Sequence, residues 1–474
     1  MIRNGTPITL KYFVYFTFIG LICLSPSLKI MPQSILLTNF HDDKRLIELL
    51  LISFILLYSL IVTNNNQSFQ LRQPIQYGIY LLITFAITSS YLAYSPRHAL
   101  IEITVFTGLI YLALFVANSY RENNRLLIRQ ITYIFWASIF LCMLSFYVGY
   151  IAATFSFTPL TWPAPLTGFT NIRSFNQYQL WTLGLITLPL LAFDFKSSHA
   201  RNWVHLGLIF WWVLLFHAAS RGVLLAWGLG ILITAIVYRK LAWPFIRLQL
   251  SHIAAGFLSY EILFEVIPYL RGSAVVTGTI IRDSTKDRIE LWSQCINLIQ
   301  NHPFFGVGPM HFAWNSNTNA HPHNSVLQIM AEWGLAAALL IMAVAGYGLF
   351  CWLKKFNIEN LQTKGRLDCN LAIVLFFTLI ANAAYSLVDG VIVMPISQVL
   401  MFTIIGLMIG YYSKNDVAEV KRKSFFLPIF AGITLITLTW STLPEILQSA
   451  SGDAKRFSMG YTAAGPRFWL EVKQ

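Results

Sequence analysis

The sequence predicts an all-α, polytopic integral membrane protein of about 12–13 transmembrane helices, and three observations predict this class. Of its 474 residues, 56% are hydrophobic and only 11% are charged, whereas a soluble chain carries about 25% charge. Apolar runs of 18 or more residues recur along the whole chain, and a helix of about 20 residues crosses roughly 30 Å of hydrocarbon. The runs lack the alternating ten-residue pattern of barrel strands, so helices are the expected spanning form.

Thirteen apolar runs, bounded by polar clusters, are expected to span the membrane. They lie near residues 11–25, 46–63, 75–94, 99–118, 126–150, 176–195, 203–219, 222–238, 248–268, 325–353, 370–392, 396–412 and 425–443. The first run has no small-residue cleavage signal behind it, so we expect it to remain as an anchor. We expect a single transmembrane domain over residues 1–474.

The distribution of Lys and Arg predicts the orientation. With the N-terminus inside, 19 of the 33 basic residues fall in inner segments and six in short outer loops. This asymmetry is the positive-inside pattern. The net charge of +13 therefore reflects topology, and no nucleic-acid partner is expected. The five cysteines are scattered, which indicates neither a disulfide framework nor a metal site.

A long outer loop over residues 268–324 is expected to be ordered. Residues after Asp283 offer a helix start, and Asn301-His302-Pro303 ends that helix. The predicted helix carries an apolar stripe of Ile289, Trp292, Cys295, Ile296 and Ile299. We therefore expect an amphipathic helix at the membrane surface.

Basic residues at the outer ends of spans are candidates for binding phosphate groups. Arg221 lies between two spans with almost no loop to solvate it, and a guanidinium suits bidentate capture of phosphate. Arg288 opens the amphipathic helix beside Arg282 and Lys286, and Arg173 precedes another span. The alternatives are an interfacial anchor for Arg221, a solvated helix start for Arg288, and a structural role for Arg173.

The strongest local signal is His323-Asn324 at the outer start of a span. An imidazole has a reference pKa of about 6.5 and accepts a proton from an attacking hydroxyl near neutral pH. A helix starting there would also present free amides to an anion. The alternative is that the pair only caps the helix. Asp389, at another outer edge, is expected to orient the histidine or a sugar, or else to form an ion pair.

Other site chemistries are less well indicated. A zinc site would have to use His302, His311, His321 and His323. No cysteine or carboxylate shares their spacing, so no metal is expected. The inner segments carry no Walker or Rossmann glycine motif and are too short for a nucleotide-binding domain, so no cofactor is expected.

Several of these motifs together resemble a known family. They are Ser220-Arg221-Gly222, Asn301-His302-Pro303-Phe304-Phe305-Gly306-Val307-Gly308-Pro309, and His323-Asn324-x-x-Leu327 followed by Gly334. They resemble motifs of the O-antigen ligase and O-antigen polymerase superfamily, bacterial inner-membrane glycosyltransferases that use undecaprenyl-pyrophosphate-linked glycans. The resemblance covers mainly residues 170–334.

The resemblance implies a reaction and its partners. A glycan passes from undecaprenyl pyrophosphate to an acceptor hydroxyl, lipid A-core for a ligase, with inversion at the periplasmic face of the inner membrane. His323 matches the family's essential histidine, and Arg221 and Arg288 match its pyrophosphate-handling arginines. The expected substrate-binding residues are Arg173, Arg282, Lys286, Asn324 and Asp389.

Three alternative functions remain open. A polymerase or a protein O-oligosaccharyltransferase shares the donor chemistry and differs in the acceptor. A lipid-linked glycan flippase would be a transporter, which is expected to show inverted repeats and ionisable groups near the midplane. The polar candidates gather at the outer edge of the spans, and this favours chemistry over transport.

Overall fold

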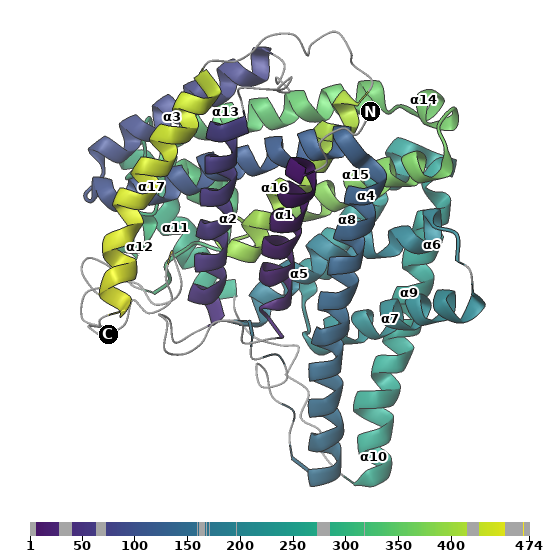
Figure 1. Ribbon diagram of the computed structural model, residues 1–474. Coiled ribbons are helices and arrows are strands. Elements are labelled where there is room, and N and C mark those ends of the chain that lie inside the picture. Colours follow the sequence, from purple (N-terminus) through teal and green to yellow (C-terminus); the bar gives the residue numbers. More distant parts are fainter. Residues whose placement is uncertain are drawn as a thin grey trace. The chain divides into compact units, whose positions relative to one another are not determined.

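The computed structural model describes residues 6–27, 40–62, 73–158, 160, 166, 168–169, 171–195, 197–272, 285–316, 318–414, 426–450 and 468. In this part of the chain the regular structure is helical and contains no strand (Figure 1). The predicted all-α class is therefore confirmed. The chain forms two compact units, each built from three separate stretches and each described here by itself.

Unit 1 comprises residues 1–30, 125–282 and 356–385. Its elements are α1 (Thr6–Leu24), the second part of α4 (Pro96–Ser156), α5 (Ile172–Leu183), η2 (Leu185–Thr187), α6 (Leu188–Ala192), α7 (Ser198–His217), α8 (Arg221–Tyr238), η3 (Arg239–Ala242), α9 (Trp243–Glu261), η4 (Ile262–Val266), α10 (Ile267–Arg271), α14 (Ile358–Gln362) and α15 (Arg366–Tyr385). The largest contacts within it join α15 to α8 and α7 to α9.

Unit 2 comprises residues 31–124, 283–355 and 386–474. Its helices are α2 (Phe40–Val62), α3 (Gln73–Leu92), the first part of α4, α11 (Thr285–Asn301), α12 (Phe312–Asn315), α13 (Ser325–Lys355), α16 (Pro395–Ser413) and α17 (Phe426–Ala450). Within it α13 packs on α3 and α11, while α2 packs on α16 and α17. Helix α4 belongs to both units and breaks at Asn123, whose φ of −152° and ψ of 78° are not helical.

Each of the thirteen expected spans coincides with helical structure. Within the described residues, seven stretches are long and apolar enough to cross a membrane: Gln73–Leu92, Pro96–Ser156, Arg221–Arg271, Ser325–Lys355, Arg366–Tyr385, Pro395–Ser413 and Leu427–Pro444. Pro96–Ser156 and Arg221–Arg271 are 61 and 51 residues long, and each covers two expected spans. The chain is therefore a multi-pass membrane protein.

Several expected boundaries differ from the structure; the span near 370–392, for example, ends at Tyr385 in α15. The span near 176–195 is interrupted, because α5 ends at Leu183 and is followed by η2 and α6. Gly184 lies at this break, where a Cβ would overlap Thr378 of α15. The span near 126–150 extends further than expected, because α4 continues to Ser156.

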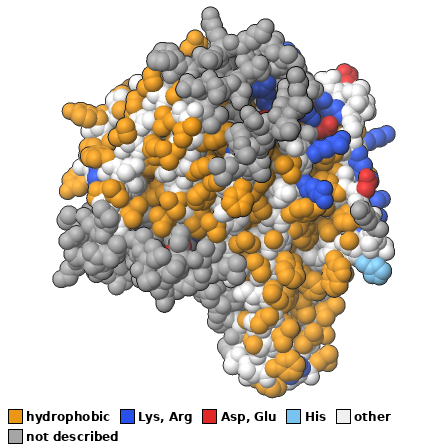
Figure 2. Space-filling view, in the orientation of Figure 1, with side chains coloured by type: hydrophobic (Ala, Val, Ile, Leu, Met, Phe, Trp, Pro, Cys, Tyr) orange, Lys and Arg blue, Asp and Glu red, His pale blue; other side chains and the backbone are white. Residues whose placement is uncertain are grey.

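Exposed apolar side chains and close helix contacts agree with a lipid environment. Figure 2 shows hydrophobic side chains over much of the visible surface. On α8, Leu225 is 75% exposed and Ile236 is 65% exposed, a pattern that only lipid makes favourable. In unit 2, Gly406 and Gly410 of α16 form a Gly-x-x-x-Gly pair that approaches the backbone of α4.

Candidate functional site

His323 lies in a tight turn directly before α13. Its φ is +53°, a left-handed conformation that costs a side-chain-bearing residue energy and recurs at functional sites. The side chain is buried, with 7% of its surface exposed. The ring of His321 stands perpendicular to it, with 4.2 Å between the ring centroids. The turn thus fixes two imidazoles against each other at the end of a helix.

Asp389 lies in the turn after α15 and faces His323. Its Oδ1 is 3.4 Å from His323 Nδ1 and accepts a 2.8 Å hydrogen bond from the Gly390 amide. Two further hydrogen bonds hold the segments together: Ser325 donates its amide to the Ser386 carbonyl and its hydroxyl to the Asp389 carbonyl. A carboxylate at Nδ1 favours the tautomer with its proton there and leaves Nε2 as the proton acceptor. The structure therefore pairs the two residues that the sequence singled out 66 positions apart.

Asn324 is the N-cap of α13. Its Oδ1 accepts hydrogen bonds from the amides of Val326 and Leu327, each 3.0 Å long. The Ser325 amide donates to the Ser386 carbonyl, and the Gln328 amide donates to the Asn324 carbonyl. The expectation that these amides are free for an anion is therefore wrong, because the chain itself satisfies them. Substrate contact by the Asn324 side chain stays a prediction.

Helix α11 brings Arg288 to the neighbourhood of this turn. The Trp292 indole donates a 3.1 Å hydrogen bond to the carbonyl of Pro322, the residue before His323. Arg288 precedes Trp292 by four residues and so lies on the same side of α11. Its Nε is buried and has no hydrogen-bond partner among the described residues. Arg282 and the side chain of Lys286 lie outside the described residues.

The amphipathic helix is confirmed in place and in its end at Asn301, but its stripe is partly wrong. Ile289 and Ile296 are 60% and 49% exposed. The buried face keeps Trp292, Cys295 and Ile299 of the expected stripe and adds Leu291, and these residues pack with residues of α12 and α13. Burial raises the pKa of the Cys295 thiol above its ordinary value, and the nearby Glu332 carboxylate raises it further.

The glycine-rich turn after α11 fits onto a kink in α13. At the kink Gly334 has a φ of +86°, and the Leu335 amide donates to Pro303 of the turn instead of to its own helix. In exchange, the Val307 and Gly308 amides donate to the carbonyls of Ala331 and Glu332. The turn therefore replaces hydrogen bonds that the kink removes from α13.

Glu332 of α13 is a buried carboxylate for which the sequence indicated no structural role. Glu332 is fully buried. Its Oε1 accepts the Phe312 amide at the start of α12, and its Oε2 accepts a hydrogen bond from Gln328. His311 beside it uses both ring nitrogens, one with the Ser95 amide and one with the Pro309 carbonyl. Because both ring nitrogens of His311 form hydrogen bonds that stabilise the turn, His311 is a poor ligand for the zinc site considered from the sequence.

Arg221 and Arg173 both lie at helix starts in unit 1. Arg221 is the first residue of α8, is exposed, and follows Ala219, whose φ is +49°. Arg173 is in the first turn of α5, which Asn171 caps through a 2.9 Å hydrogen bond from the Ser174 amide. Helices α5 and α8 contact each other. Both guanidinium groups thus lie near the positive ends of packed helices, where an anion is favoured.

An apolar groove in unit 2 is separate in character from the histidine site. It is lined by Gln76, Ile79, Tyr80, Ile83, Thr107, Ile110, Tyr111, Leu114, Leu427 and Phe430. These residues belong to α3, the first part of α4 and α17, and they are apolar or uncharged. The groove suits an apolar chain, and its lining contains no histidine, carboxylate or basic side chain.

These features define a polytopic, all-helical membrane protein with a buried histidine–carboxylate pair at a helix end. The O-Antigen ligase family model matches residues 206–342, a segment that includes Arg221, Arg288 and His323. This match confirms the resemblance and supports the O-antigen ligase superfamily, whose members transfer glycans as ligases or polymerases. Arg173 and Asp389 lie outside the matched segment. Comparison with curated proteins gives no match.

Proposed function

We propose that this protein transfers a glycan from undecaprenyl pyrophosphate to an acceptor hydroxyl, that of lipid A-core, at the periplasmic face of the bacterial inner membrane. The matched family supports glycan transfer. The positive-inside distribution of Lys and Arg supports an outward-facing site. The proposal requires no cofactor, no metal and no nucleic acid; its partners are the lipid-linked glycan, the acceptor and membrane lipids.

The observation that carries the proposal is the contact of His323 with Asp389. A histidine that acts as a general base is oriented through one ring nitrogen and takes the proton on the other. Asp389 occupies the Nδ1 side of the ring, so Nε2 takes the proton of the acceptor hydroxyl. The left-handed backbone of His323 is a strain that the surrounding hydrogen bonds maintain, as in other preorganised sites.

The leaving group requires positive charge. When the acceptor oxygen attacks the anomeric carbon, the bond from that carbon to the pyrophosphate oxygen breaks and negative charge grows on the phosphate. Arg288 and Arg221 stabilise this charge in the proposed reaction. Attack from the opposite side inverts the anomeric carbon, and the proton ends on His323. Arg173, Arg282, Lys286 and Asn324 are proposed to contribute to substrate binding.

Two substitutions test these roles. His323→Ala and Arg221→Ala are each expected to reduce transfer by about 10²-fold or more, because one stabilising group in such a site contributes about 10²–10³ in rate. His302→Ala and Arg201→Ala are the matched controls, since both residues are exposed and lie outside the proposed machinery. Normal transfer by either site variant, at equal membrane level, would refute the assignment.

The assay separates the alternative functions. The chromosomal gene is deleted, surface glycans are compared on gels, and wild type or His323→Ala is restored. Bare lipid A-core with accumulated lipid-linked glycan indicates a ligase, whereas a single repeat unit on core indicates a polymerase. Purified protein is then incubated in detergent with lipid-linked glycan and acceptor. A flippase forms no glycosidic bond, so it would give no transfer product in this assay.

A further inference from the structure

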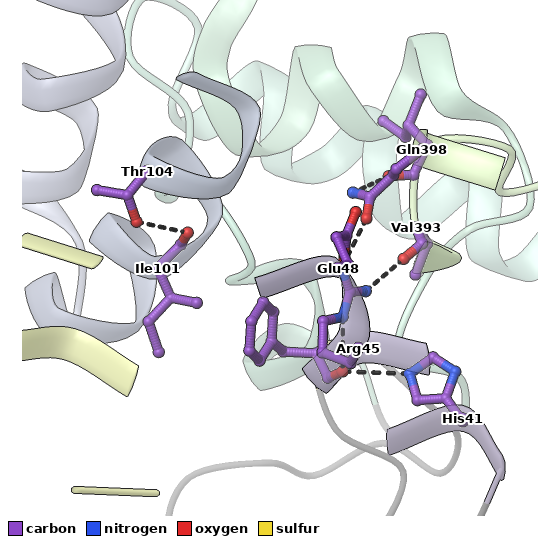
Figure 3. A network of polar contacts seen from close by, with 9 residues as sticks. His41, Arg45, Glu48, Ile101, Thr104, Val393 and Gln398 are labelled. Atoms are coloured by element: carbon purple, nitrogen blue, oxygen red, sulfur yellow. Dashed lines mark hydrogen bonds and ion pairs between the residues drawn. The ribbon is translucent and has the colours of Figure 1, made fainter. Parts of the chain in front are cut away.

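A second polar cluster in unit 2 centres on Arg45, in the first turns of α2 (Figure 3). Arg45 has only 1% of its surface exposed. Its Nη1 donates to Glu48 Oε2 at 2.5 Å and to Gln398 Oε1 at 2.6 Å, and its Nη2 donates to the Val393 carbonyl at 2.7 Å. Its Nε donates to the Phe468 carbonyl at 3.3 Å. One guanidinium thus joins α2, α16, the turn before α16 and Phe468.

Histidine 41 completes the cluster without adding a second charge. His41 is buried, and its Nε2 donates to the Phe468 carbonyl at 3.1 Å. Burial, together with the positive charge of Arg45, lowers the pKa of His41 to about 3. His41 is therefore neutral near pH 7, and Arg45 carries the positive charge of the cluster.

Hydrogen bonds connect this cluster to the proposed catalytic residues. Gln398, held by Arg45, donates to the Ile392 carbonyl at 2.7 Å. The Val393 amide, beside the carbonyl that Arg45 binds, donates to the Gly390 carbonyl. Gly390 in turn donates its amide to Asp389 Oδ1, the atom that faces His323. A continuous series of contacts therefore runs from Arg45 to the imidazole.

Stability alone is a weak reason for such a pair. Removing two charges from water costs several kcal/mol for each ion, and buried pairs are often replaceable by apolar residues without loss. What an arginine provides is a planar fork of donors in fixed directions. Here the fork binds two points of the segment 389–398, one on the turn and one on α16.

We propose that Arg45, together with Glu48, is a positioning residue of the histidine site: it fixes the segment 389–398 so that Asp389 stays against His323. The role rests on the proposed function, because positioning matters only if His323 is the base. Arg45 itself does not touch the substrate. Its loss leaves Asp389 present but free to leave the imidazole.

The test measures His323 directly, independent of any transfer assay. Modification of His323 by diethylpyrocarbonate is followed by mass spectrometry from about pH 5 to 8. A facing carboxylate favours the protonated ring. The pH midpoint of His323 modification in Asp389→Asn is therefore the reference value for a protein that has lost this contact. His321 also faces the ring and is scored separately on the same peptide. Arg45→Gln and Glu48→Gln are both expected to move the midpoint of His323 to lower pH by about 0.5–1 unit.

The paired variants separate position from charge. Arg45→Gln removes a positive charge, so a purely electrostatic effect would move its His323 midpoint to higher pH. Glu48→Gln removes an acidic group, whose electrostatic effect would have the opposite sign. Thr104→Val is the matched control, because Thr104 is buried nearby but bonds only within α4. If Arg45→Gln does not accumulate in the membrane, Gln398→Leu is the second variant. It removes the hydrogen bond between Arg45 and Gln398 and keeps both Arg45 and Glu48. Opposite shifts, or no shift in either variant, overturn the proposal.

Kinetics provide the second readout. We expect Arg45→Gln to lower kcat about 10-fold or more, with KM for the lipid-linked donor within about twofold, because the lost interaction acts on the chemical step. A raised KM with an unchanged His323 profile would overturn the proposal and make Arg45 a phosphate-binding residue. If wild type transfers no glycan, the proposed function fails, while the His323 profile still decides the role of Arg45.

Discussion

Replacing Gly334 with alanine tests how the kink of α13 is built. Gly334 has a φ of +86° and a ψ of 165°, a region that only glycine occupies without strain. A Cβ at this position would lie closer than 3.0 Å to the Phe304 carbonyl and the Phe305 amide. Neither atom is the end of a flexible side chain, so the backbone of the turn would have to move.

Two terms give the expected magnitude. The unfavourable backbone conformation costs about 1–3 kcal/mol. Overpacking against a fixed backbone costs about 1–3 kcal/mol more. Gly334→Ala is therefore expected to lower the free energy of unfolding by about 2–6 kcal/mol, the sum of these two terms. Since α13 begins at the His323 turn, we expect transfer activity to fall together with stability.

The assay compares apparent melting temperatures in one detergent at one heating rate, since membrane proteins often unfold irreversibly. Gly346→Ala is the matched control: it lies in the same helix and a Cβ there meets nothing within 4 Å. Alanine is favoured over glycine inside a helix by about 0.5–1 kcal/mol, so this variant should be unchanged or slightly more stable. Equal melting temperatures for the two variants would refute the reasoning.

Two further predictions concern α11 and the cap of α13. Cys295 should resist maleimide in the folded protein even at pH 8, because burial raises the pKa of its thiol and keeps it protonated, and it should react after denaturation. Its exposed neighbour, as Ile296→Cys, should react with a membrane-impermeant maleimide added to spheroplasts; labelling only after lysis would place α11 on the inner side. Asn324→Ala should destabilise the protein by about 1 kcal/mol through the lost cap, and Asn324→Asp should keep that stability. A drop in transfer with normal melting in the aspartate variant would show that the amide also binds substrate, whereas a stable alanine variant would contradict the cap.

The sequence by itself determined the fold class, the helical segments and most residues of the candidate site. Long apolar runs leave a chain few choices in a membrane, because each backbone amide must be satisfied within its own helix. His323 and Arg221 stood out for the same reason: charged and titratable groups are costly at the edges of such runs. Their chemistry could be predicted from residue type and from the family resemblance.

Only the tertiary structure decided which of these residues meet. The contact of Asp389 with His323 joins turns 66 residues apart, and no spacing rule relates them. The sequence also could not show that the first amides of α13 are occupied, since the Ser325 amide finds its partner at Ser386. The sequence gives no sign of a site role for Arg45, although it is buried and connected to the Asp389 turn. Side-chain geometry of this kind depends on packing between distant segments, which hydrophobic periodicity does not encode.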